Sequence, residues 1–217
     1  TPSTTLEVDL KHTLSPKQSE VFTNIATSQE NFHLIHGVTG SGKTEIYCHL
    51  IAEALQKNQQ ILFLVPEINL TPQLFKYLNS VFKDQVVTYN SKLNKTERLK
   101  AHLDALHQNK QIFLGSRSAS FLPFKNLGLI IMDEEHDQAY KQDTNPRYHT
   151  RAITQFLHSI HKCKVIYGSA TPSMEIYKAA KSDQKLCYYR LSEKVNNSKE
   201  PEITLVCLRN HIKANPE

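Results

Sequence analysis

Cysteine is scarce in this 217-residue chain, and the four that occur lie far apart in the sequence. They are Cys48, Cys163, Cys187 and Cys207. None belongs to a C-x-x-C pair, so zinc is not expected in this chain. Three of them stand in apolar or strand-like surroundings, which is typical of buried thiols in a reduced, cytoplasmic protein.

Long hydrophobic runs, repeats and low-complexity segments are also missing. No run approaches the roughly 20 apolar residues of a membrane-spanning helix, so no membrane partner is expected. The chain has no signal peptide and starts at Thr1 rather than at a methionine. We therefore expect a piece of a longer protein.

The composition that remains is that of a soluble globular protein, with 39% hydrophobic and 22% charged residues. Its length suits one α/β domain with a sizeable core, or two small domains. The net charge of +5 is compatible with a nucleic-acid partner but does not require one.

The most specific motif directly follows the apolar run 32–36 and fits G-x-x-x-x-G-K-[ST]. It consists of Gly37, Val38, Thr39, Gly40, Ser41, Gly42, Lys43 and Thr44. Such glycines let backbone N–H groups curl around phosphate oxygens, and the next helix adds a positive dipole end. We expect Lys43 to reach the β- and γ-phosphates of ATP and Thr44 to bind Mg²⁺. The alternative is a glycine-rich turn without a ligand.

The hydrophobic pattern predicts an α/β fold. Short apolar runs without strict alternation favour buried parallel strands at 32–36, 61–65, 112–114, 127–132 and 165–167. Helical stretches are predicted at about 16–27, 43–57, 72–82, 94–108, 148–161 and 173–181. Their alternation indicates a mostly parallel sheet with helices on both faces. A capping residue followed by proline marks three helix starts, at Ser15-Pro16, Thr71-Pro72 and Thr171-Pro172.

Each predicted strand ends in a polar or glycine-containing cluster. The clusters are 37–44, Pro66-Glu67, 115–118, 133–136 and 168–171. Ligands of open α/β sheets bind at the carboxyl ends of the strands, so we expect one composite site. The alternative is that these are the polar loops that every such sheet needs.

Three carboxylates follow the apolar run that ends at Met132. Asp133 occupies the position that holds the Mg²⁺ shell in P-loop enzymes, and Glu134 is placed to act as general base. Acids at 133, 134 and 135 repel one another unless a cation lies there. The alternative is a solvated acidic turn.

A guanine-nucleotide site is the less favoured interpretation. Asn94-Lys95-Thr96-Glu97 resembles N-K-x-D only faintly, ends in Glu and precedes the Asp133 strand. We interpret it as a helix start that Asn94 caps.

The order of these motifs resembles that of superfamily 2 helicases. Within that superfamily the chain is similar to the PriA family of primosomal replication-restart DNA helicases, from about Leu14 to Arg209. The stretches 140–142 and 147–149, after Asp-Glu-Glu-His, are more diagnostic than the shared helicase motifs. The resemblance implies the first RecA-like lobe of a 3′-to-5′ DNA helicase that couples ATP hydrolysis to translocation.

The resemblance also implies residue roles. Gln18 matches an adenine-contacting glutamine, although a capping box with Ser15 explains it equally well. Arg117 and the Pro66-Glu67 turn match positions along the DNA backbone. His136 and Ser169 match positions that link the ATP site to the Gly168-Ser169-Ala170-Thr171 motif. Residues 137–151 match an aromatic-rich loop in which bases stack on Tyr140 and Tyr148, and phosphates meet Lys141, Arg147 and Arg151.

The resemblance divides the chain into a lead-in (1–14), the ATP-binding lobe (15–192) and a segment (193–217) toward a missing second lobe. That segment includes a strand-like run at 203–208. The second lobe with its arginine finger, the DNA-binding domains and the zinc-binding cysteines have no counterpart here. The family's partners are forked or single-stranded DNA, primosome proteins and single-strand-binding proteins. Ala152 and Cys207 depart from the family pattern.

Two rival interpretations stay open. One is another superfamily 2 translocase, such as a restriction-enzyme motor or an RNA helicase. The other is a nucleotide-gated binding module without catalysis, against which Lys43, Asp133 and Glu134 argue.

Overall fold

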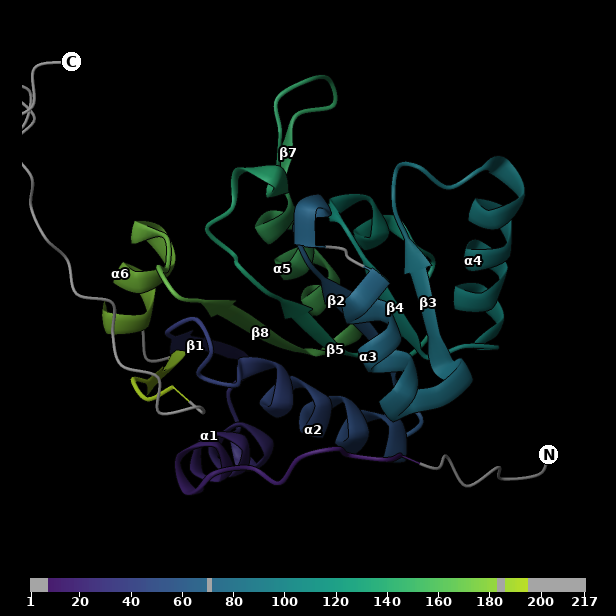
Figure 1. Cartoon of the computed structure of the whole chain (residues 1–217). Coiled ribbons are helices and arrows are strands. Elements are labelled where there is room, and N and C mark those ends of the chain that lie inside the picture. Colours follow the sequence, from purple (N-terminus) through teal and green to yellow (C-terminus); the bar gives the residue numbers. More distant parts are fainter. Residues whose placement is uncertain (1–7, 70–71, 183–185, 195–217) are drawn as a thin grey trace, which may run out of the picture.

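The computed structural model describes residues 8–69, 72–182 and 186–194. Within them, seven strands form one parallel sheet in the order β3-β4-β2-β5-β8-β1-β9 (Figure 1). The strands are β1 (Phe32–Gly37), β2 (Gln60–Leu64), β3 (Val86–Tyr89), β4 (Ile112–Gly115), β5 (Leu127–Met132), β8 (Lys164–Ser169) and β9 (Leu186–Leu191). The helices are α1 (Pro16–Thr27), α2 (Lys43–Gln56), α3 (Pro72–Phe82), α4 (Lys95–His107), α5 (Thr150–His161) and α6 (Met174–Ser182). A short antiparallel hairpin pairs β6 (Lys141–Gln142) with β7 (Tyr148–His149).

The predicted α/β fold is confirmed, and each predicted strand and helix is found within two residues of its expected bounds. The two edge strands, β3 and β9, were not predicted. Both are half-buried, so neither shows the continuous apolar run of the central strands. The strand-like run predicted at 203–208 lies outside the described residues.

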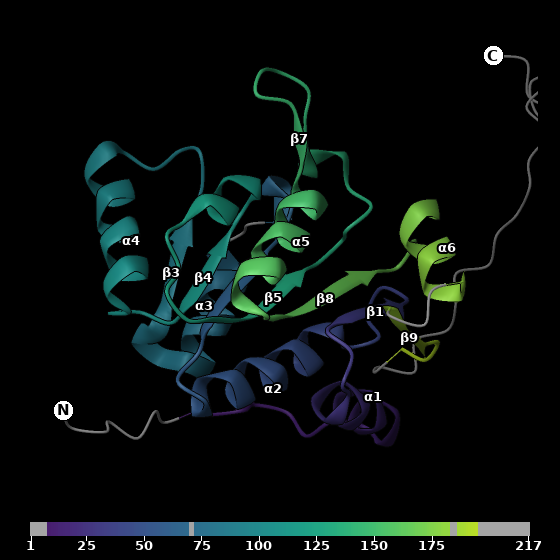
Figure 2. The ribbon, with the colours of Figure 1, turned by 180° about the vertical axis from the view of Figure 1, so that it is seen from behind.

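The sheet has a core on each face. On one face, α1, α2 and α3 pack against inward side chains of the strands such as Ile35, Phe63 and Ile131. On the other face, α4, α5 and α6 pack against Leu34, Leu62 and their neighbours (Figure 2). The central strands are buried on both faces, which explains their unbroken hydrophobic runs.

Helix starts follow the predicted capping logic with one exception. Ser15 and Gln18 form a complete capping box on α1, and Asn94 and Glu97 form another on α4. The start predicted at Thr171-Pro172 is wrong, because α6 begins at Met174. Ser173, directly before it, is held by the Glu135 carboxylate, which accepts from the Ser173 N–H at 2.6 Å. The Thr71-Pro72 start lies partly outside the described residues.

In the part of the chain that the structure describes, no helix is both long and apolar enough to cross a bilayer. The hairpin β6–β7 projects from the body beside the carboxyl ends of the strands (Figure 1). That edge of the sheet therefore carries both the 37–44 loop and the most prominent projection of the fold.

Candidate nucleotide-binding site

Residues 38–44 of the loop line a cavity of about 600 Å³ together with Gln18, Asp133 and Glu134. Two glycines of the loop, Gly40 and Gly42, have φ angles of +80° and +76°. These angles lie in the left-handed region that side chains with a Cβ rarely adopt. The loop therefore curls over the cavity only because glycine stands at these positions.

Lys43 is 8% exposed, and its Nζ donates to the Gly37 carbonyl at 2.8 Å. The Ser41 hydroxyl is buried and has no hydrogen-bond partner among the described residues. A Cβ on Gly37 would lie 2.5 Å from that hydroxyl. The loop thus has a tight cradle, a buried cation and an unsatisfied donor, which together fit a phosphate ligand.

Gln18 serves the capping box and also contacts the loop. Its Oε1 accepts from the Ser15 N–H at 2.8 Å, and its Nε2 donates to the Ser41 carbonyl at 2.9 Å. The predicted capping role is confirmed, and the side chain also fixes α1 to the loop. The adenine contact stays a prediction.

Asp133 follows β5 and is held from two sides. The Tyr47 hydroxyl donates to Asp133 Oδ1 at 2.9 Å, and the Tyr140 hydroxyl donates to the Asp133 carbonyl at 2.7 Å. Burial raises the pKa of the Asp133 carboxyl to about 6, and the Glu134 carboxylate adds to this shift. Lys43 acts in the opposite direction. This carboxyl is therefore one that a bound cation would stabilise in its charged form.

Glu134 adopts a left-handed backbone with φ +47°, which is uncommon for a residue with a side chain. Its Oε1 lies 4.0 Å from Lys43 Nζ, and its Oε2 lies 3.7 Å from His136 Nδ1. Glu134 lines the cavity, whereas the next residue, Glu135, is fully buried and does not line it.

Glu135 is neutralised by an arginine of the fold. It is fully buried, and its Oε2 lies 2.9 Å from Arg151 Nη2. The Ser173 hydroxyl donates to the same carboxylate at 3.0 Å. The expectation that a cation lies beside these acids is met for Glu135 by the Arg151 guanidinium. The prediction that Arg151 meets phosphates is wrong in this arrangement, because its guanidinium pairs with a buried carboxylate.

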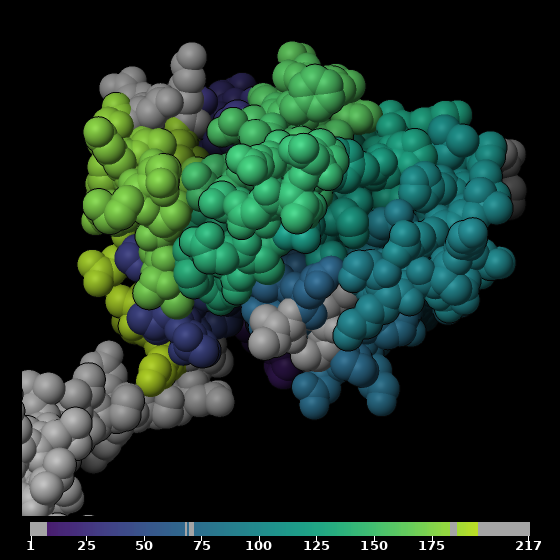
Figure 3. All heavy atoms as spheres, turned by 90° about the horizontal axis from the view of Figure 1, so that it is seen from above, coloured from purple at the N-terminus to yellow at the C-terminus, as the bar shows by residue number. Residues whose placement is uncertain are grey.

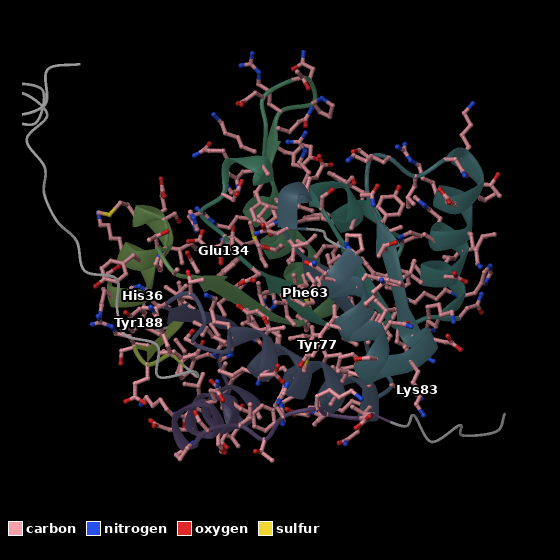
Figure 4. All side chains as sticks on the ribbon, in the orientation of Figure 1. His36, Phe63, Tyr77, Lys83, Glu134 and Tyr188 are labelled. Carbon is pink, nitrogen blue, oxygen red and sulfur yellow. The ribbon has the colours of Figure 1, made fainter. Side chains whose placement is uncertain are left out.

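His136 and Ser169 lie together, as the resemblance to the helicase family implied. Their Nδ1 and Oγ atoms are 2.7 Å apart, and Ser169 Oγ also accepts from the Thr171 N–H at 3.0 Å. A second link comes from His36, directly before the loop, whose ring nitrogens contact the Ala170 carbonyl and the Tyr188 hydroxyl (Figure 4). The strand ends 37, 133 and 169 are thus connected through side chains.

Tyr140 cannot stack on a base in this arrangement, so that prediction is wrong. Its ring is 0% exposed and belongs to the core beneath the hairpin. The Thr150 hydroxyl donates to its carbonyl at 2.9 Å. The Tyr140 ring packs into the apolar interior because burying its large apolar area is more favourable than leaving that area in water.

The other residues of the loop that were predicted to contact DNA, Lys141, Arg147 and Tyr148, are accessible. Lys141 and Arg147 are exposed, although Lys141 Nζ lies 3.0 Å from Asp143. Tyr148 is partly exposed and packs edge-on against Phe121, with ring centroids 5.2 Å apart. Phe121 itself is 55% exposed, and no motif in the sequence indicated it.

Arg117 binds the backbone where the β6–β7 hairpin begins. Its Nη1 donates to the carbonyls of Ala139 and Lys141, which flank Tyr140 in the chain. Nearby, Glu67 accepts from the hydroxyls of Ser91 and Ser116 at 2.9 and 3.2 Å. The strand ends 66–67 and 115–118 are therefore neighbours, as their positions predicted.

Sequence reasoning missed Tyr47 and Tyr77. Tyr47 lies on α2 one turn after the loop, and no motif in the sequence marks it. The Tyr77 hydroxyl donates to Glu45 Oε1 at 2.6 Å and so ties α3 to the helix that follows the loop. A spacing rule cannot find such residues, because each partner comes from a distant segment.

The parallel sheet, the glycine-shaped loop and the acids after β5 define a RecA-like P-loop nucleotide-binding lobe. The chain belongs to the DEAD/DEAH box helicase family, which it matches over residues 15–179. Membership implies the use of a nucleotide, which supports the ATP expectation in its general form.

The relatives are replication restart proteins PriA, which confirms the resemblance drawn from the motifs. The chain is 40% identical to that of Synechocystis sp. over 206 residues, which are 92% of this chain and 25% of the relative. It is 41% identical to that of Bacillus subtilis over 189 residues, covering 86% of this chain and 23% of the relative. The chain thus spans about a quarter of the length of these relatives.

Solved structures confirm the fold. RecG bound to a three-way DNA junction matches with a TM-score of 0.67 and 22% identity, covering 94% of this chain and 27% of that one. The DUF1998 helicase MrfA bound to DNA matches with a TM-score of 0.60 and 19% identity, covering 83% and 27%. At these identities the likeness concerns the fold alone.

Proposed function

We propose that the chain is the ATP-binding motor lobe of a 3′-to-5′ DNA helicase that restarts stalled replication forks. The observation that carries this is the convergence of Lys43, Asp133 and Glu134 on one cavity. Residues 15–192 form the lobe, and 193–217 lead toward a second lobe. Forked or single-stranded DNA, primosome proteins and single-strand-binding proteins are the partners of the longer, cytoplasmic protein.

In the proposed site, the backbone of 37–44 and the Lys43 ammonium bind the triphosphate. Gln18 contacts the adenine base. Thr44 and Asp133 hold Mg²⁺. The described residues contain no group of three or more His, Cys, Asp or Glu side chains suited to a metal. This suits Mg²⁺, which binds through few carboxylates together with phosphate oxygens. Mg²⁺ would neutralise charge on the phosphates of ATP. Glu134 would accept a proton from the water that attacks the γ-phosphorus, while the bond from that phosphorus to the bridging oxygen breaks and ADP leaves.

The hairpin is the proposed DNA contact. Lys141, Arg147 and Tyr148 offer cations and a stacking surface, and Phe121 extends it. Arg117 and Tyr140 support a coupling role, because Arg117 holds the backbone on both sides of Tyr140 and Tyr140 bonds to Asp133. His136 and Ser169 form the corresponding link on the other side of Glu134.

The test is nucleotide binding and hydrolysis in the longer protein. Lys43→Ala is expected to weaken ATP binding, whereas Glu134→Gln is expected to retain binding and lose hydrolysis. Glu175→Gln, an exposed acid on α6, is the matched control. The isolated chain should bind nucleotide weakly and turn over slowly, since losing an arginine finger costs about 10³–10⁵ in rate. Rapid DNA-stimulated hydrolysis by residues 1–217 alone would contradict this.

The two rivals have their own outcomes. Preferential unwinding of an RNA duplex over forked DNA by the longer protein would favour another translocase. Normal replication restart by the Lys43→Ala protein would favour a nucleotide-gated binding module.

A further inference from the structure

Helix α4 carries a row of leucines on its solvent side. Leu99, Leu103 and Leu106 are 60%, 43% and 37% exposed. Their spacing of four and three residues places them on one face of the helix. The opposite face, with Ala101 and Ala105, is buried in the core. The leucine spacing alone would favour a face that packs against the sheet. Instead, the small residues Ala101 and Ala105 face the sheet, and the leucines face solvent.

The charges of α4 are sorted in the same way. At about 100° per residue, Lys95 flanks the leucines on one side and Lys100 on the other. Both lysines are exposed and have no ion pair within the described residues. The two acids of the helix lie beyond Lys100, on the side away from the leucines. Glu97 accepts from the Asn94 N–H, and Asp104 is 7% exposed. We call Leu99, Leu103 and Leu106 with these two lysines the leucine face of α4.

The leucine face stands at the outer end of the fold. In Figure 1, α4 is the outermost helix beside β3, the edge strand of the sheet. Seen from above, the teal segment that contains α4 forms the rim of the molecule on that side (Figure 3). No described element of the chain covers this side of the helix, so a partner can reach it.

We propose that the leucine face of α4 is a docking surface for an acidic amphipathic helix of a separate protein. Apolar anchors of such a helix would cover the leucines, and its carboxylates would meet Lys95 and Lys100. A second copy of this chain would oppose cations to cations. Nucleic acid would meet the lysines but leave the leucines without apolar contact. A contact with another part of the longer polypeptide is also polar at its rim, and it would leave the leucines covered and the glutamate peptide unbound when the longer protein replaces the 217-residue chain.

The test uses the 217-residue chain and two synthetic helical peptides of about 14 residues. Both carry leucines at i, i+4 and i+7, and they differ only in flanking glutamates or flanking lysines. Fluorescence anisotropy is expected to show at least about tenfold tighter binding of the glutamate peptide. Leu99→Ser with Leu103→Ser should weaken it about tenfold or more, and Lys95→Glu with Lys100→Glu should reverse the preference between peptides.

Matched controls use equally exposed residues elsewhere. Phe156→Ser with Ile160→Ser, on α5, and Lys17→Glu with Lys178→Glu should leave both affinities unchanged, and thermal melts verify folding of every variant. Failure of the glutamate peptide to bind, or equal binding of both peptides, would overturn the proposal. The proposal would also be overturned if sedimentation showed that the chain forms a dimer and that Leu103→Ser dissociates it. Leucine-dependent binding to phosphatidylcholine–phosphatidylglycerol vesicles, without a peptide preference, would assign the face to membranes instead.

Discussion

The Tyr47 hydroxyl donates a 2.9 Å hydrogen bond to Asp133 Oδ1, and both groups lie against Gly168. Burial raises the pKa of Tyr47 well above its usual value, so this hydroxyl stays a donor. One oxygen of the proposed Mg²⁺ ligand is thereby fixed by a residue of the helix that begins in the phosphate loop.

Tyr47→Phe should therefore weaken the Mg²⁺ dependence of nucleotide binding. Without its donor, Asp133 Oδ1 loses its orientation, and the concentration of Mg²⁺ needed for half-maximal ATP binding should rise several-fold. The loss in folding stability should be about 1 kcal/mol. Titration with Mg²⁺ at fixed nucleotide measures the first effect. Tyr167→Phe removes another buried hydroxyl, away from Asp133, and should leave the Mg²⁺ titration unchanged; a shift of equal size there would contradict the prediction.

Gly168→Ala should be strongly destabilising. Its new Cβ would lie 1.8 Å from the Tyr47 hydroxyl oxygen and 2.8 Å from Asp133 Oδ1, so the tyrosine must move. Overpacking of this kind costs about 1–3 kcal/mol. Urea unfolding measures the loss. The double variant with Tyr47→Phe should recover part of it, because the clashing oxygen is gone; strict additivity of the two changes would refute the explanation.

The two tyrosines of the predicted loop should respond in opposite ways. Tyr140→Ala removes a fully buried ring and should cost about 3–5 kcal/mol of stability. Tyr148→Ala should cost little stability but weaken single-stranded DNA binding of the longer protein by about 1–3 kcal/mol. Chemical denaturation and anisotropy with an oligonucleotide separate the two. If Tyr148→Ala left DNA binding intact, the hairpin would not be a stacking surface.

Stability should fall in mild acid because of His33. Burial lowers the pKa of this ring from 6.5 to about 4, so the folded state disfavours the proton that the unfolded chain binds. The contribution of neutral His33 is therefore complete above pH 6.5 and is lost as the pH falls toward 4. Between pH 7 and pH 5 the loss should be about 2 kcal/mol.

The measurement is urea unfolding at a series of pH values. His33→Asn should flatten the decline between pH 7 and pH 5, whereas His107→Asn, an exposed histidine on α4, should not. An unchanged slope in the His33 variant would show that another group titrates.

The sequence predicted the sheet and its loops well because the central strands are buried on both faces. Continuous apolar runs such as 127–132 leave little choice of structure, and the glycines of 37–44 have few other uses. Local signals also placed the capping boxes of α1 and α4, whose partners are three residues apart. The edge strand β3 was not predicted, because a half-buried strand of four residues has too weak a hydrophobic pattern.

Errors arose where a residue type allowed two environments. Tyr140 and Arg151 both suit nucleic acid, yet one fills the core and the other pairs with buried Glu135. No local pattern distinguishes these outcomes, because the deciding partners, Asp133 and Glu135, lie 7 and 16 residues earlier in the chain and meet Tyr140 and Arg151 only through the fold. The outward leucines of α4 show the same limit for apolar residues.

The sequence by itself determined that this protein has a phosphate loop, acids after a buried strand and the motif order of a helicase lobe. These follow from local chemistry: glycine torsion angles, hydrophobic runs and neighbouring residues. Only the tertiary structure decided which acids face the cavity, that Tyr47 holds Asp133, and which face of α4 meets solvent. Each of these depends on groups brought together from distant segments, where packing and charge pairing choose among side chains that look alike in sequence.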